Sequence, residues 1–125
     1  MKKLLLTLAF MSLGGCAAFT PTPFDNNLYD HVVNVNILVK NAKANCGTVA
    51  SFYMVYAGSE MLTVKEYLKH RAGNDDLVKA TNLIKKDIDS YNNIKQPSVT
   101  YCVDKTGIIE SELNGVLDAI GGKPQ

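Results

Sequence analysis

Most residue types and motifs that mark enzymes, metal sites and nucleic-acid-binding proteins are missing from this 125-residue sequence. It has no GxSxG, Walker A or HExxH motif, and neither of its two histidines, His31 and His70, has a histidine or cysteine one helical turn away. The formal net charge is only +1, and no long basic run is present to neutralise phosphates. We therefore expect no catalytic residue, no cofactor, no metal ion and no nucleic-acid partner.

Acidic side chains are present, but their pattern is that of helix surfaces. The glutamates that offer a carboxylate pair are Glu60, Glu66, Glu110 and Glu112. Because charged residues on helices usually face water, we interpret them as solvated.

Long apolar runs are missing as well, apart from one near the N-terminus. Lys2 and Lys3 precede the apolar stretch 4–13, which is followed by Gly14-Gly15. At about ten residues this stretch is too short for a bilayer core, which needs ~20 helical residues. The order of basic, apolar and small residues predicts an export signal; the alternatives are an N-terminal membrane anchor or a buried first helix.

The end of that stretch, Leu13-Gly14-Gly15-Cys16, resembles the lipobox of bacterial lipoprotein precursors. The resemblance covers only the signal. It implies that residues 1–15 are removed and that the Cys16 thiol carries a diacylglyceryl group. The fatty-acid chains of that group, such as palmitate, would anchor the protein in the lipid bilayer. In Gram-negative lipoproteins, aspartate after the cysteine favours inner-membrane retention, so Ala17 implies the outer membrane, with the domain facing the periplasm or the surface.

Residues 16–24 are predicted to form a short tether between the lipid and a single domain. Pro21 and Pro23 disfavour helix and favour extended backbone. The seven residues 17–23 within it reach at most about 25 Å, which keeps the domain close to the membrane. We assign residues 25–122 to that domain and residues 123–125 to a tail.

Apolar residues at steps of three and four predict helices in the domain. Asp25 or Asn26, Asn74 and Ser98 are the expected N-caps of the first, third and last helices, and Gly47 is placed to end the first. Gly107 and Gly115 suggest close approach to a neighbouring helix. The expected buried positions are Leu28, Val32, Val35, Val39, Ala42 and Cys46 in the first helix, Leu77, Ala80, Ile84, Ile88 and Tyr91 in the third, and Val99, Cys102, Thr106, Ile109, Leu113, Val116 and Ile120 in the last.

The segment 48–72 is less regular. Its Thr63-Val64-Lys65-Glu66 resembles a capping box, and Gly58-Ser59 weakens a helix interior, so either one kinked helix or two helices broken within 58–63 are expected. Its apolar face is expected to comprise Val49, Phe52, Tyr53, Tyr56, Ala57, Met61, Val64 and Leu68. The aromatic residues Phe52, Tyr53 and Tyr56 are interpreted either as part of the core or as a partner surface.

These segments predict an all-α, up-down-up-down bundle of four helices. In that topology the end of the first helix and the start of the last lie together, which brings Cys46 near Cys102. Because an exported compartment is oxidising, we expect a disulfide between them; buried free thiols are the alternative. The connections at this end should point away from the membrane.

The function predicted from the sequence is a lipid-anchored protein of the bacterial envelope that binds an envelope protein as an interaction, structural or accessory module. The alternative is a small-ligand or cofactor carrier with a dry, tyrosine-lined pocket of some hundreds of Å³. A single sequence marks neither surface directly.

Overall fold

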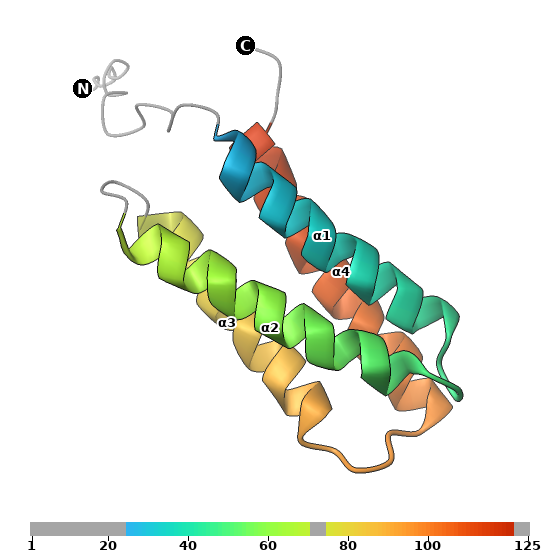
Figure 1. The fold of residues 1–125 in the computed structure, drawn as a ribbon. Coiled ribbons are helices and arrows are strands. Elements are labelled where there is room, and N and C mark those ends of the chain that lie inside the picture. Colours follow the sequence, from blue (N-terminus) through green and yellow to red (C-terminus); the bar gives the residue numbers. More distant parts are fainter. Residues whose placement is uncertain (1–24, 71–74, 122–125) are drawn as a thin grey trace, which may run out of the picture.

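The computed structural model describes residues 25–70 and 75–121 and confirms the expected all-α bundle. The four helices are α1 (Asn26–Ala44), α2 (Ala50–Lys69), α3 (Asp75–Asn92) and α4 (Val99–Gly121). Successive helices run in opposite directions, and α1 packs against α2 and α4 while α3 packs against the same two helices (Figure 1). The α1–α2 and α3–α4 connections lie at one end of the bundle, and α1 begins and α4 ends at the other (Figure 1).

The start of α1 is fixed both by its cap and by a contact with α2. The Asp25 carboxylate accepts a hydrogen bond from the backbone N–H of Leu28 at 3.1 Å, as expected of an N-cap. The Tyr67 hydroxyl donates to the other carboxylate oxygen of Asp25 at 2.5 Å. One acidic residue therefore caps α1 and joins it to the last turns of α2.

The predicted helical periodicity locates most of the core. In α1 the buried apolar residues are Leu28, Val32, Val35, Val39 and Ala42. In α4 the seam is buried from Cys102 to Val116, and the Ser98 hydroxyl caps the helix by accepting from the Tyr101 backbone N–H at 3.0 Å. Val99, expected in the seam, is exposed instead because it lies in the first turn, at the end of the bundle.

Of the two alternatives for the segment 48–72, the one with two separate helices is wrong, since α2 is a single helix from Ala50 to Lys69. Thr63 is not a cap: its hydroxyl donates within the helix to the Ser59 carbonyl. Gly58 is buried against α3, where an added Cβ would lie 3.3 Å from the Asn92 side-chain nitrogen and 3.4 Å from Ile88 Cγ2. Its small size therefore allows close packing of α2 against α3.

The close approach expected at Gly107 and Gly115 is also wrong. A Cβ added at either position would meet no atom within 4 Å. Gly47 lies beyond the end of α1, in the turn before α2, with φ at +92°, a conformation that favours glycine.

Cys46 and Cys102 are joined by a disulfide, with their Cα atoms 5.7 Å apart. This is the pair that the bundle topology predicts. The bond connects the segment after α1 to the first turn of α4 across a sequence separation of 56 residues. It thus holds the two chain-distant helices together at the end where the connections lie.

Candidate functional sites

The residues predicted to carry the lipid, Cys16 and the tether 16–24, lie outside the described residues, as do Asn74 and the tail 123–125. Within the part of the chain that the structure describes, no helix is both long and apolar enough to span a bilayer. The described residues instead contain two apolar surface features, one on α2 and one between α3 and α4.

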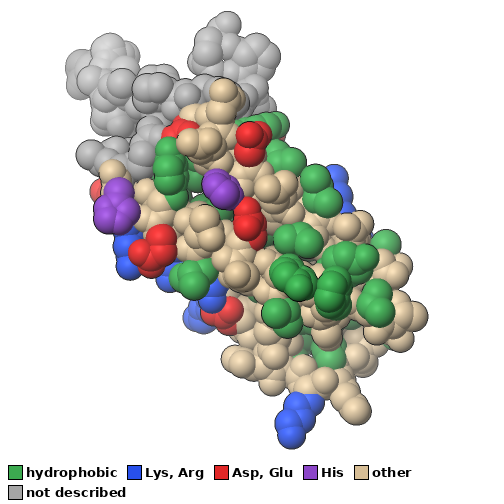
Figure 2. Space-filling model, in the orientation of Figure 1, with side chains coloured by type: hydrophobic (Ala, Val, Ile, Leu, Met, Phe, Trp, Pro, Cys, Tyr) green, Lys and Arg blue, Asp and Glu red, His purple; other side chains and the backbone are tan. Residues whose placement is uncertain are grey.

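The first feature is an aromatic patch on the first turns of α2, formed by Phe52, Tyr53 and Tyr56. Phe52 is 60% exposed and Tyr56 is 54% exposed, whereas Tyr53 packs partly against the core. The Phe52 ring meets both tyrosine rings edge to face, at centroid distances of 5.5 Å and 5.0 Å. Hydrophobic side chains gather over the half of this face nearest the α1–α2 connection (Figure 2).

This exposure corrects the expected apolar face of α2. Val49, Phe52 and Tyr56 lie on the surface, and the core is reached instead by Ala50, Met54 and Gly58 together with the expected Ala57 and Met61. The first half of α2 is apolar nearly all round, so periodicity alone does not select its buried side. Between the two interpretations of the aromatic cluster, the structure excludes the core for Phe52 and Tyr56.

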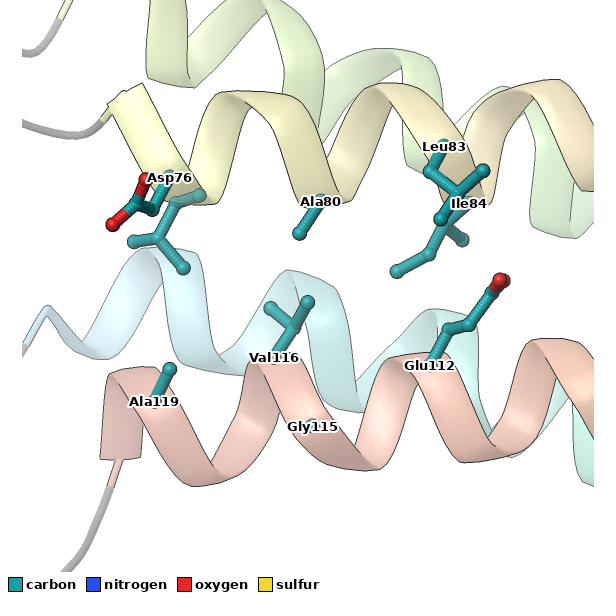
Figure 3. A pocket seen from close by; sticks show the side chains of 9 residues that line it. Asp76, Ala80, Leu83, Ile84, Glu112, Gly115, Val116 and Ala119 are labelled. Atoms are coloured by element: carbon teal, nitrogen blue, oxygen red, sulfur yellow. The ribbon is translucent and has the colours of Figure 1, made fainter.

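The second feature is a groove between α3 and α4, with a cavity of about 300 Å³. Of the four neighbouring helix pairs, these two make the least extensive contact. The walls are aliphatic and include Ala80, Leu83 and Ile84 from α3 and Gly115, Val116 and Ala119 from α4 (Figure 3). No aromatic residue lines this cavity. It is therefore different from the tyrosine-lined pocket that we expected of a ligand carrier.

Two carboxyl groups also line the cavity. Asp76 lies near the start of α3, and Glu112 extends from α4 toward α3 (Figure 3). The interpretation of Glu112 as a solvated residue is wrong, because its Oε1 atom is inaccessible to water and has no hydrogen-bond partner among the described residues.

The environment of Glu112 favours its neutral form. Burial, then a hydrogen bond with Asp87 and the negative charge of Asp87, raises the pKa of the Glu112 carboxyl from 4.5 to about 7, against the opposing charge of Lys105. Lys105 itself donates to Asp87 Oδ1 at 3.1 Å. Asp87 of α3 thus interacts with two residues of α4, Glu112 and Lys105.

The remaining glutamates and His31 form ion pairs at or near the surface. His31 Nδ1 lies 2.7 Å from Glu60 Oε2, which links α1 to α2. Glu110 pairs with Lys43 of α1 at 3.2 Å, and Glu66 pairs with Lys69 one turn along α2. No cluster of three metal-ligating residues occurs within residues 25–70 and 75–121.

The sequence predicted neither the groove between α3 and α4 nor the burial of the Glu112 carboxyl group. One signal was available: Glu112, Gly115 and Ala119 recur at steps of three and four beside the buried seam, which places them on one strip of α4. Small residues on such a strip fit either close helix packing or an open space, and the sequence does not distinguish the two.

Comparison with known proteins gives no relative from which to transfer a function. No family model, no curated protein and no solved structure matches this chain.

Proposed function

We propose that this protein is a lipid-anchored component of the bacterial cell envelope, with the outer membrane as its site, and that it binds another envelope protein through the aromatic patch of α2. The signal and lipobox ending at Cys16 support the anchor. The observation that carries the binding proposal is the exposure of Phe52 and Tyr56. Aromatic side chains are enriched at the centres of protein interfaces, where they bury much area at a small cost in conformational entropy.

The position of the patch supports the same proposal. It lies near the α1–α2 connection, whereas α1 begins at the opposite end of the bundle (Figure 1). A chain anchored ahead of α1 would therefore present the patch away from its membrane. From there it can reach a partner in the periplasm or at the cell surface.

Site-specific crosslinking tests the binding surface. A photo-crosslinking residue at position 52 should capture a discrete protein in intact envelopes, because the Phe52 position would be covered by the partner. The matched control is Leu62, also on α2 and 47% exposed but on another side of the helix, where no discrete product should form. Equal products at positions 52 and 62 would remove the aromatic patch as the specific surface.

The anchor has its own test, which does not depend on the partner. The Cys16→Ser chain should lose incorporation of radiolabelled palmitate and should be released from membranes by high salt once the signal is removed. A processed Cys16→Ser chain that stays membrane-bound at high salt would refute lipid anchoring while leaving the crosslinking result unaffected.

A further inference from the structure

The α3–α4 groove is an apolar space that no side chain of the described residues fills. Its volume of about 300 Å³ equals roughly ten water-sized volumes. A Cβ placed on Gly115 meets nothing within 4 Å, and the exposed lining is almost wholly apolar. A partner helix, about 10–12 Å across with its side chains, does not fit within this space. The groove therefore suits a single apolar side chain, which leaves water there without giving up a hydrogen bond.

The groove lies at the end of the bundle where α1 begins. Its walls come from the first turns of α3, over residues 76–84, and from the last turns of α4, over residues 112–119. In the antiparallel bundle, α3 begins and α4 ends at the same end at which the chain enters α1 (Figure 1). The stretches of sequence that adjoin the described residues at this end are therefore the nearest candidates to occupy it.

Only one of these stretches carries large apolar side chains once residues 1–15 are removed, as the proposed function requires. Residues 71–74 and 122–125 contain no aromatic residue and no leucine, isoleucine, valine or methionine. The tether 16–24 contains Phe19 and Phe24. An aromatic side chain in a tether exposes apolar surface to water unless something covers it.

The reach of the tether distinguishes its two aromatic residues. α1 and α3 lie across the bundle from each other, and neighbouring helix axes are about 8–10 Å apart, so this diagonal is about 11–14 Å (Figure 1). Phe24 directly precedes Asp25, the N-cap of α1, and a single residue step of about 4 Å does not cross that distance. Phe19 lies six residues before Asp25, a span of at most about 20 Å, which does.

The energetics also favour Phe19 over a lipid chain as the occupant. An acyl chain gains little by leaving a bilayer for the groove, because both surroundings are apolar, whereas the Phe19 ring leaves water. Pro21 and Pro23 lie between Phe19 and α1 and already restrict the free tether, which lowers the entropy lost on docking. The cost of closing so short a loop grows only slowly with its length.

We propose that the tether docks on its own domain, with the Phe19 ring in the α3–α4 groove. Cys16 lies three residues before Phe19, a span of at most about 11 Å, so docking holds the α3–α4 side close to the lipid. α2, which carries the aromatic patch, lies across the bundle from α4 (Figure 1). Docking thus turns the patch away from the membrane; this consequence rests on the proposed lipid anchor, whereas the docking itself does not.

A single fluorescent reporter tests the docking. The chain has no tryptophan, so Phe19→Trp adds the only one. In the lipidated chain in phosphatidylcholine nanodiscs, Gly115→Leu should fill the groove, shift this emission to longer wavelength and raise its acrylamide quenching roughly twofold or more, because the docked population is lost. Gly107→Leu is the matched control, since Gly107 does not line the cavity and also has open space around it, and it should change neither quantity. Identical emission with and without Gly115→Leu, with helix content intact by circular dichroism, would overturn the proposal.

Intramolecular crosslinking tests the same contact with Phe19 in place. A photo-crosslinking residue at Leu83, on the rim of the groove and 49% exposed, should link to a peptide within residues 17–24 on mass spectrometry. The same residue at Ile37 of α1, which is 50% exposed and lies outside the groove, should not. A product between position 83 and a bilayer lipid, with none to residues 17–24, would assign the groove to an acyl chain and overturn the docking of Phe19.

The processed Cys16→Ser chain separates this proposal from the lipid anchor. In solution without a bilayer, Phe19→Trp in that chain should still emit at shorter wavelength than the same chain with Gly115→Leu. Loss of this difference in the absence of lipid would show that the ring inserts into the membrane and would overturn the docking. If the difference persists while the unmodified chain incorporates no palmitate, the docking stands and the lipid anchor fails.

Discussion

The α1–α2 and α3–α4 pairs are both antiparallel helix pairs, but one is closed along its length and the other is open over part of it. Polar contacts from Tyr67 to Asp25 and from His31 to Glu60 join α1 to α2. The aromatic patch of α2 lies on the surface, outside the contact between these two helices. The α3–α4 pair is joined toward the end of α3, where the Tyr91 and Tyr101 rings stack at 5.9 Å. Beyond that contact the two helices leave the groove.

The difference shows that small residues bring helices together only where nothing larger holds the helices apart. Gly58 allows α2 and α3 to approach, and the Asn92 side chain completes the contact by donating to the Met54 carbonyl at 3.0 Å. Gly115 lies on the same strip of α4 as Glu112, whose side chain extends between the helices. The same residue type therefore closes one interface and leaves the other open.

The largest effect should come from removing the link between the two pairs. The Cys46–Cys102 disulfide closes a long loop, and the chain-entropy model gives it about 4 kcal/mol. Reduction, or Cys46→Ala with Cys102→Ala, should lower the melting temperature by on the order of 10–20 °C. Thermal melts followed by circular dichroism, with and without reductant, measure it. Coincident melts would show that the bundle does not depend on the bond.

A smaller effect should separate the closed interface from the open one. Gly58→Leu forces a side chain against Ile88 and Asn92 and should destabilise the fold by about 1–3 kcal/mol. Gly115→Leu enters empty space, improves helix propensity by up to ~1 kcal/mol and should not destabilise. Denaturant titration of both variants measures the difference. Similar losses at both positions would mean that the α3–α4 pair is as closely packed as α2–α3.

The same comparison explains what could be predicted from the sequence. The seams of α1 and α4, the caps at Asp25 and Ser98 and the proximity of the two cysteines follow from spacing and topology, because each depends on helical periodicity or on chain direction. The buried side of α2 was not predictable, since Val49 and Phe52 are as apolar as the Ala50 and Met54 that replace them in the core. The groove was not predictable because it depends on the distance between two helices, which periodicity does not encode.

The smallest effect concerns the carboxyl group in the groove and has a definite sign. The pKa of Glu112 lies above its usual value of 4.5, at about 7, so the folded chain binds more protons than the unfolded chain between these pH values. This group's contribution to the unfolding free energy is therefore complete below pH 4.5, falls as the pH rises to 7 and is lost above it. Because glutamine does not ionise, Glu112→Gln removes this pH-dependent loss of unfolding free energy.

After allowance for solvent screening, Glu112→Gln should gain stability relative to the unmodified chain by on the order of 1 kcal/mol between pH 5 and pH 8. Denaturant titrations at the two pH values measure the gain. Glu66→Gln, at an exposed glutamate of α2, is the matched control and should follow the unmodified chain at both. If the stability of Glu112→Gln instead changes between pH 5 and pH 8 by the same amount as that of the unmodified chain, the α3–α4 groove admits enough water to solvate this carboxylate. The closed and open helix pairs would then differ in hydration as well as in packing.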